Sequence, residues 1–169
     1  MKIATLTLAD LAATKRFGLF LAKQLMVGDV LALQGVLGAG KSELARVIIQ
    51  QVCPDETDIP SPTFTLVQAY ESDDIGSLLH FDLYRLAEPG DVFELGIEDA
   101  FVEAVCLIEW PERLAGYLPD HALTIEIDYD PVTNGDREVT LSGDAAWQKR
   151  LKGILPDLMV VSLSKSQRD

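Results

Sequence analysis

The sequence predicts an α/β fold, in which a mixed, mainly parallel central sheet is flanked by helices. Two observations lead to this expectation. Segments with a helical spacing of apolar residues alternate with short apolar runs typical of buried strands. A glycine-rich segment also joins one such run directly to the next helical segment. The length of 169 residues suits a single hydrophobic core. We expect residues 1–160 to form one domain and residues 161–169 to be a flexible tail.

The first half of the chain predicts two helices, a strand and a hairpin. Helices are indicated by apolar residues at three- and four-residue steps, and strands by short apolar runs or alternation. The elements expected on this basis are a helix over 8–26, a strand over 30–33, a helix over 42–52, and strands over 64–70 and 78–81. The turn-forming residues between the last two strands favour an antiparallel hairpin.

The second half predicts three further strands and two further helical segments. The apolar run 104–108 is typical of a buried strand, and Asn134-Gly135 is a typical turn between two alternating segments. The other expected elements are a helical segment over 91–101 interrupted at Gly96, strands over 122–129 and 137–141, and a helix over 144–155.

The net charge of −13 argues against tight, direct binding of nucleic acid. Surfaces that bind nucleic acid are basic, because phosphate contacts supply much of the affinity. Here Lys and Arg are scattered and form no cluster. A basic protein partner fits the charge, and so does the alternative that the acidity only keeps the protein soluble.

The cysteines and the apolar segments indicate a soluble, cytoplasmic protein. Two cysteines, Cys53 and Cys106, do not make a disulfide framework, and the N-terminus has no apolar signal core. The most apolar stretch, residues 17–27, contains Lys23 and is too short to span a bilayer. We therefore expect no association with a membrane.

The most informative motif is Gly35-Val-Leu-Gly-Ala-Gly-Lys-Ser42, which has the spacing of a P-loop. The backbone N–H groups of such a loop surround the phosphates of a nucleotide, and its glycines allow the close approach. Lys41 is expected to neutralise the β- and γ-phosphates, and the Ser42 hydroxyl to bind Mg²⁺ at the start of a helix that favours anions. An apolar strand precedes the motif and a helix follows it. The sequence therefore predicts a site for ATP and Mg²⁺ that includes Gly35, Gly38, Ala39, Gly40, Lys41 and Ser42.

Two carboxylates are candidates for the second ligand of the metal. The Mg²⁺ of a P-loop site is also held by an acidic residue that ends an apolar strand. Asp82 follows the run 78–81 and Glu109 follows the run 105–108. One of them is expected to contact the metal and the other to position the attacking water, and either assignment fits the sequence.

Four other residues near these motifs have alternative interpretations. Thr63, in Ser61-Pro-Thr63, is either a switch hydroxyl that senses the γ-phosphate or part of a proline-stiffened turn. Trp110 either covers the nucleotide or packs in the core. His80, within a strand run, is expected to be a core or edge histidine rather than a base. Arg85 lies three residues after Asp82 and is expected to face the site.

The missing motifs narrow the class of nucleotide-binding protein. The Asn/Thr-Lys-x-Asp tetrad that reads guanine is absent. Arg113, Arg137 and Arg150 are too dispersed for the arginine-rich lid of a small-molecule kinase. The alternatives to an ATPase are therefore such a kinase without an evident lid and a regulatory nucleotide-binding module. For the ATPase we expect slow hydrolysis by the chain alone and acceleration by a partner.

Four sequence blocks together resemble the tRNA threonylcarbamoyladenosine biosynthesis ATPase family (TsaE/YjeE), in family order and at family-like spacing. The resemblance extends over roughly residues 5–142. The blocks are Gly35-x-Leu-Gly-Ala-Gly-Lys-Ser42, Ser61-Pro-Thr-Phe-Thr-Leu-Val67, His80-Phe-Asp-Leu-Tyr-Arg-Leu86 and Leu107-Ile-Glu-Trp-Pro-Glu112.

The resemblance implies a bacterial ATPase that is needed for the t⁶A modification at position 37 of tRNAs reading ANN codons. It implies two partners, the threonylcarbamoyl-transferase subunit and its paralogous companion, whose turnover ATP hydrolysis supports. It also implies that Ser42 and Glu109 hold Mg²⁺, that Asp82 assists hydrolysis, and that Thr14 and Arg137 lie near the nucleotide.

Three positions depart from the family pattern. Val36 stands where the family usually has Asp, and Ser42 and Glu43 stand where it usually has Thr. Serine keeps the hydroxyl, so we expect metal binding to persist. The absence of an acid at position 36 removes one negative charge beside the phosphates.

Overall fold

A seven-stranded sheet forms the centre of the computed structural model, which describes residues 1–130, 135–153, 155 and 156. The expected tail and Asn134 lie outside the described residues. The strands are β1 (Lys2–Leu8), β2 (Val30–Gln34), β3 (Val67–Ser72), β4 (Gly76–Asp82), β5 (Val105–Glu109), β6 (Leu123–Tyr129) and β7 (Arg137–Ser142). The helices are α1 (Leu11–Ala22), α2 (Lys41–Val52), α3 (Ile97–Glu103) and α4 (Ala145–Lys152), with 3-10 segments η1 (Pro89–Leu95) and η2 (Pro111–Leu114).

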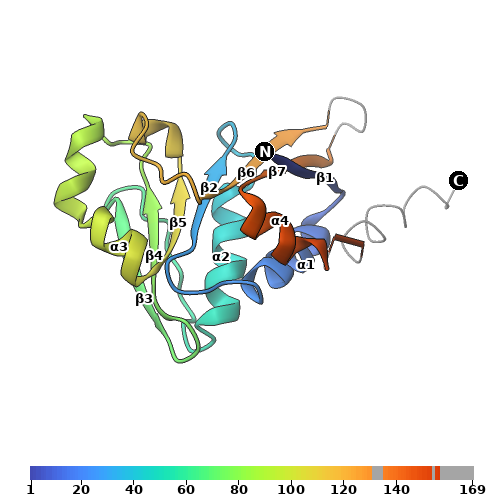
Figure 1. Ribbon diagram of the computed structural model, residues 1–169, viewed down its shortest axis with the longest axis horizontal. Helices are drawn as coiled ribbons and strands as arrows, with labels where there is room; N and C mark the ends of the chain where they lie inside the picture. Colours follow the sequence, from blue (N-terminus) through green and yellow to red (C-terminus); the bar gives the residue numbers. More distant parts are fainter. Residues whose placement is uncertain (131–134, 154, 157–169) are drawn as a thin grey trace, which may run out of the picture.

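The sheet is mixed, with a parallel centre and antiparallel edges (Figure 1). Its strand order is β1-β7-β6-β2-β5-β4-β3. The four central strands β6, β2, β5 and β4 are parallel to one another, whereas β7 and β1 extend one edge and β3 the other in antiparallel pairs. The predicted α/β fold with a mixed, largely parallel sheet is confirmed, as is the hairpin of β3 and β4.

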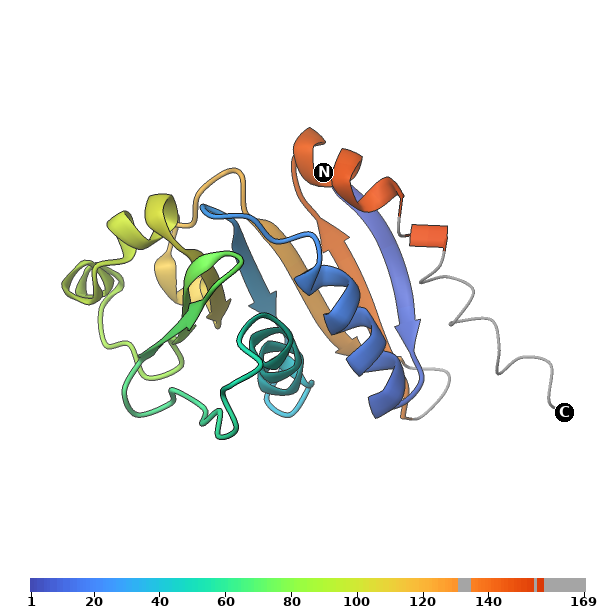
Figure 2. The same ribbon diagram turned by 90° about the horizontal axis from the view of Figure 1, so that it is seen from below.

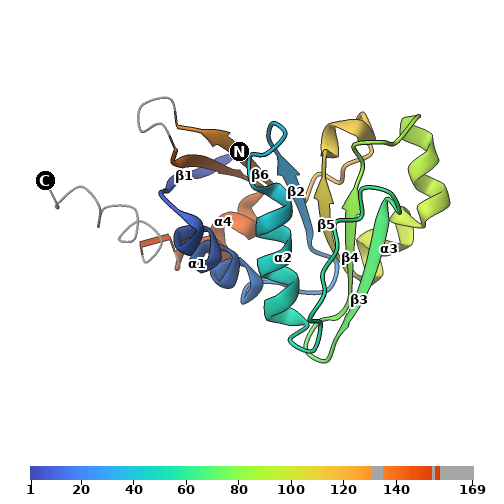
Figure 3. The same ribbon diagram turned by 180° about the vertical axis from the view of Figure 1, so that it is seen from behind.

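Two helical layers cover the faces of the sheet. Figure 3 shows α1 and α2 side by side in front of one face, and Figure 2 shows the same arrangement from below. The side chains of β2 point alternately into the two layers. Leu31 and Leu33 belong to the core beneath α1 and α2, whereas Val30 packs in the core formed with η1, α3 and η2. Buried strands of this kind are apolar on both faces, which explains the continuous apolar run in the sequence.

The N-terminal segment differs from the prediction, because residues 2–8 form a strand and the first helix begins only at Leu11. The Asp10 side chain accepts a hydrogen bond from the Ala13 backbone N–H (2.8 Å) and so caps the helix. The preceding segment pairs with β7, with Leu6 opposite Val139. Leu8 fits both the helical spacing and the alternation of a strand. The predicted helix therefore began too early, at residue 8 instead of Leu11.

Candidate active site

Three neighbouring parallel strands end at one edge of the sheet, and the predicted functional groups follow them there. The glycine-rich loop follows β2, Asp82 ends β4 and Glu109 ends β5. Asp82 and Glu109 are directly paired in the register of β4 and β5, and Leu33 of β2 is paired with Glu109. In open α/β sheets, ligands bind outside the carboxyl ends of the strands.

The loop between β2 and α2 has the backbone geometry of an anion cradle. Gly35 has a φ of 146°, and a Cβ atom there would lie 2.3 Å from the Ile127 carbonyl oxygen, so a side chain does not fit. Gly40 has a φ of 112° and precedes α2 without a side-chain cap. The N–H groups of the first turn of α2 are therefore left to a ligand, and the N-terminus of a helix favours an anion.

The Lys41 ammonium group lies within this loop. Its Nζ donates hydrogen bonds to the carbonyl oxygens of Gly35 (2.7 Å) and Val36 (2.9 Å). It also lies 4.1 Å from the centre of the Trp110 ring. Burial lowers the pKa of Lys41, and the nearby carboxylates of Glu109, Glu112 and Asp82 oppose that shift. The ammonium is thus held by neutral carbonyls in a position where a phosphate would meet it.

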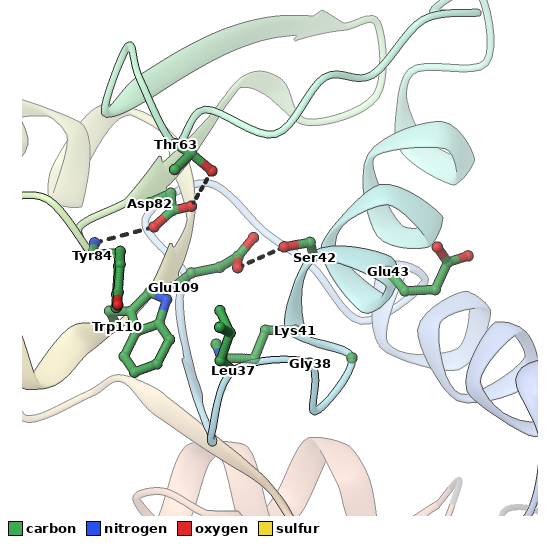
Figure 4. A pocket seen from close by; sticks show the side chains of 11 residues that line it. Leu37, Gly38, Lys41, Ser42, Glu43, Thr63, Asp82, Tyr84, Glu109 and Trp110 are labelled. Carbon is green, nitrogen blue, oxygen red and sulfur yellow. Dashed lines mark hydrogen bonds between the residues drawn. The ribbon is translucent and has the colours of Figure 1, made fainter.

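The two predicted metal ligands are in direct contact (Figure 4). The Ser42 hydroxyl donates to Glu109 Oε2 at 2.8 Å. The other carboxylate oxygen, Glu109 Oε1, lies 2.8 Å from His80 Nε2. His80 is buried, as expected from the sequence, but its contact with Glu109 was not predicted. The two-residue spacing from Asp82 places both side chains on the same face of β4, but the contact with Glu109 also depends on the pairing of β4 with β5.

The loop between α2 and β3 is hydrogen-bonded to the end of β4. Thr63 Oγ1 donates to Asp82 Oδ2 (2.9 Å), and the hydroxyls of Ser61 and Thr63 lie 2.8 Å apart. The other carboxylate oxygen of Asp82 accepts from the Tyr84 backbone N–H (3.1 Å). Figure 4 shows Thr63, Asp82 and Glu109 around one cavity.

Two cavities lie on either side of the glycine-rich loop and share Gly40 and Glu43. The first is lined by Leu37, Gly38, Gly40, Lys41, Ser42, Glu43, Thr63, Asp82, Tyr84, Glu109 and Trp110. The second is lined by Leu8, Asp10, Leu11, Thr14, Ala39, Gly40, Glu43, Gly135 and Arg137. Every predicted site residue except Gly35 therefore lines one of the two.

Arg137 and Tyr129 link the second cavity to the glycine-rich loop. Arg137 Nε donates to the Ala39 carbonyl oxygen (3.0 Å), and the Tyr129 hydroxyl donates to the Gly38 carbonyl oxygen (3.2 Å). The Arg137 guanidinium also lies 4.2 Å from the centre of the Tyr129 ring. The late strands β6 and β7 thus contribute side chains to a site built mainly by the first half of the chain.

Two aromatic contacts determine where Trp110 and Arg85 lie. Trp110 has a left-handed backbone (φ 58°), and its ring centre is 4.9 Å from that of Tyr84. It lines the first cavity beside Lys41. The Arg85 guanidinium instead lies 4.4 Å from the centre of the exposed Phe64 ring, and Arg85 lines neither of the two cavities.

The donor set at the first cavity fits a magnesium ion bound together with a phosphate. No group of three or more His, Cys, Asp or Glu side chains within the described residues could hold a metal alone. Mg²⁺ in such sites takes one or two protein oxygens, while phosphates and water supply the others. Ser42 and Glu109 provide two such oxygens, and Asp82 is adjacent to them.

The sequence profile described as "Threonylcarbamoyl adenosine biosynthesis protein TsaE" matches residues 8–139. The chain belongs to the TsaE family. The tRNA threonylcarbamoyladenosine biosynthesis protein TsaE of Rickettsia conorii is 39% identical over 134 residues, which cover 78% of this chain and 73% of that protein. The protein of the same name from Treponema pallidum is 37% identical over 130 residues, which cover 76% of this chain and 93% of that protein.

A solved structure of similar fold also matches the TsaE-family chain. The crystal structure of Bacillus subtilus YdiB superposes with a TM-score of 0.73 at 28% sequence identity, over 93% of this chain and 97% of that chain. The P-loop NTPase fold predicted from the sequence is therefore confirmed. Within the residues that the structure describes, no helix has the length and apolar character needed to cross a membrane.

Proposed function

We propose that this TsaE-family chain is a Mg²⁺-dependent ATPase that acts in the threonylcarbamoyladenosine modification of tRNA. The observation that carries the ATPase assignment is the hydrogen bond between Ser42 of the P-loop and Glu109, with Asp82 directly beside Glu109. A passive nucleotide-binding module needs the loop alone, whereas hydrolysis needs a metal ligand and a group that positions water. Membership of the TsaE family supports the place in tRNA modification.

The proposed roles fall to four side chains that line the first cavity. Lys41 would leave its two carbonyl partners to bind the β- and γ-phosphates. Ser42 and Glu109 would hold Mg²⁺, which when bound neutralises charge that develops on the phosphates. Asp82 would then orient the attacking water, because its contacts are with Thr63 and Tyr84 rather than with Ser42.

The rest of the nucleotide would extend across the glycine-rich loop into the second cavity. Gly40 and Glu43 line both cavities, so a chain of phosphates lying over them would carry the nucleoside toward Thr14 and Arg137. Arg137 adds a positive charge at that side, and it is anchored to the loop through Ala39. Thr63 and Trp110 would close the opposite end, beside the γ-phosphate.

We further propose that hydrolysis is slow in the isolated protein and is accelerated by its partners in the cytoplasm. Arg85, the arginine expected to face the site, lies over Phe64 instead, and no arginine among the described residues lines the first cavity. An arginine supplied there by a partner would speed phosphoryl transfer. The partners implied by the family resemblance are the threonylcarbamoyl-transferase subunit and its paralogous companion. ATP hydrolysis would drive turnover of their complex, while this acidic chain itself would not bind tRNA tightly.

The proposal is tested by phosphate release from ATP, with and without the two partner proteins, for the wild type and for Lys41→Ala. We expect stimulation of the wild type, and a loss of about 10²–10³-fold in Lys41→Ala, comparable to removing one donor that stabilises a transition-state oxyanion. Lys23→Ala, which changes an exposed lysine after α1, is the matched control. Full activity in Lys41→Ala would refute the P-loop assignment, and an unchanged rate with partners that do not co-purify would refute the partner coupling.

A further inference from the structure

The proposed hydrolysis leaves one buried polar group of the site without a role, the imidazole of His80. The side chains of His80 and Glu109 are each only 2% exposed. His80 lies on β4 and Glu109 on the neighbouring strand β5, on the side of the sheet that faces α2. The imidazole is too deeply buried behind Glu109 to meet a nucleotide, since it lines neither of the two cavities.

The direction of the hydrogen bond between the two side chains follows from their chemistry. A carboxylate that binds a metal can only accept hydrogen bonds, so we assign the ring N–H to His80 Nε2, which donates a hydrogen bond to Glu109 Oε1. The other ring nitrogen, Nδ1, is buried and has no hydrogen-bond partner among the described residues. A buried polar atom without a partner lowers stability. An apolar side chain would therefore serve the fold better at this position, and the benefit of His80 must lie in its bond to Glu109.

The two oxygens of Glu109 are held from two different elements. Oε1 accepts from His80 on β4 and Oε2 accepts from Ser42 at the start of α2. When Ser42 and Glu109 both coordinate a metal ion, the hydrogen bond between them is lost. The bond from His80 does not compete with the metal, because it uses the other oxygen. It is then the contact that fixes the rotation of the carboxylate.

We propose that His80 is a positioning residue that orients the Glu109 carboxylate and thereby sets the affinity of the site for Mg²⁺. The inference rests on the proposed function in one respect, namely that Glu109 binds the metal. Removing a group that is hydrogen-bonded to a metal ligand costs about 10–100-fold in metal affinity. The affinity for nucleotide in the absence of metal does not depend on the orientation of Glu109 and should be unchanged.

Three variants separate the donated hydrogen bond from the volume of the ring. His80→Gln places an amide N–H near the position of Nε2 and can still donate to Glu109. His80→Leu fills a similar volume without a donor. His80→Asn carries the same amide on a side chain one carbon shorter, which does not reach Glu109 Oε1. It provides a second comparison without the bond to Glu109 if His80→Leu does not fold, as judged by circular dichroism.

The experiment is isothermal titration calorimetry on the full-length protein with ADP, first in EDTA and then at increasing Mg²⁺ concentrations. We expect the Mg²⁺ concentration at half-saturation to rise about 10–100-fold in His80→Leu and His80→Asn, and to stay near the wild-type value in His80→Gln. Binding of ADP in EDTA should be the same in all four proteins.

Two outcomes would overturn the inference and leave the proposed function intact. One is a wild-type Mg²⁺ requirement in both His80→Leu and His80→Asn, and the other is a His80→Gln variant as impaired as His80→Leu. If the wild type bound no ADP with or without Mg²⁺, the proposed function itself would fail, and the inference that rests on it would fail too.

Discussion

Glu43 places a negative charge between the two cavities of the site. It lies in the first turn of α2, lines both cavities and forms an ion pair with Arg46 one turn later. A carboxylate near a helix N-terminus stabilises the helix, but it repels a ligand that carries phosphates. Arg46 offsets part of that repulsion. Glu43 is therefore a position where helix stability and nucleotide affinity oppose each other.

We expect Glu43→Gln to bind ATP more tightly than the wild type, by roughly fivefold, which corresponds to the ~1 kcal/mol between two unit charges 4 Å apart in water. The measurement is calorimetric titration with ATP at low and at high salt, and the gain should shrink at high salt because of screening. Glu103→Gln, at the end of α3, is the control for a change in net charge alone. Weaker binding in Glu43→Gln would mean that the carboxylate contacts the nucleotide favourably.

The roles of Glu109 and Asp82 can be separated by neutral, isosteric substitutions. Because Ser42 contacts Glu109 and Thr63 contacts Asp82, Glu109→Gln should lose the Mg²⁺ dependence of nucleotide binding. Asp82→Asn should keep it but hydrolyse ATP about 10²–10⁴-fold more slowly, as for loss of a group that accepts a proton. Mg²⁺ titrations and phosphate release on the same preparations test both, and the reverse pattern would exchange the two roles.

At the scale of elements, the loop between α2 and β3 is joined to β4 and to the segment that follows it by three contacts. The Thr63 hydroxyl bonds to Asp82, and Phe64 lies against Arg85. The backbone of Asp82 also donates to the Leu66 carbonyl oxygen (2.9 Å), and Leu66 has a positive φ of 65°. The loop therefore sets the position of the carboxylate that we assign to water.

Thr63→Val tests this coupling, because it keeps the shape of the side chain and removes the hydroxyl. We expect the rate of ATP hydrolysis to fall about fivefold to tenfold, which corresponds to one lost hydrogen bond of ~1 kcal/mol, with little change in the affinity for ATP. Ser61→Ala is the matched control, since it removes the neighbouring hydroxyl and leaves the bond between Thr63 and Asp82. Equal losses in both variants would argue against a specific role for Thr63.

Elements with a local signature could be predicted from the sequence, whereas those defined by distant partners could not. The strand β2, the glycine-rich loop and α2 follow one another directly in the sequence, so a single local motif predicts all three. Strand β1 depends on β7, which lies more than one hundred residues later in the chain. The segment η2 after Trp110 was not predicted either, because its start depends on the left-handed backbone of that residue.

The same distinction applies to the candidate site. That Lys41, Ser42, Asp82 and Glu109 lie together could be predicted, because the first two belong to the P-loop motif and each of the others ends a recognisable strand. The contact of His80 with Glu109 requires knowledge that β4 and β5 are neighbours, which their order in the sequence does not state. The placement of Arg85 was missed because two exposed side chains from separate loops meet there.

At the scale of the whole molecule, the reactivity of the two cysteine thiols depends on whether the core is folded. Burial raises the pKa of Cys106 to about 12, and it also raises the pKa of Cys53. Since the thiolate is the reactive form, both residues should be inert in the folded protein. They lie in the core on opposite faces of the sheet.

We expect thiol-specific reagents to label neither cysteine of the native protein and both after unfolding. Rapid labelling of native protein would contradict the assigned burial.

Cys106 also predicts a pH dependence of stability. Above its unfolded pKa of 9.0 the unfolded chain loses a proton that the folded chain retains up to about 12, so the free energy of unfolding should fall as the pH rises through this range. Denaturant titrations between these pH values measure it, with Cys106→Ala as the control.

The contact between Trp110 and Lys41 gives the protein an optical reporter of its own. The chain has two tryptophans, and the other one, Trp147, is fully enclosed in the core with its indole N–H bonded to the His121 carbonyl oxygen. If Lys41 turns from the indole of Trp110 to a phosphate, as the proposed function requires, we expect the emission of Trp110 to change and that of the enclosed Trp147 to stay constant. Fluorescence of the unlabelled protein should then report nucleotide binding, with Trp147 as the internal reference in the same chain.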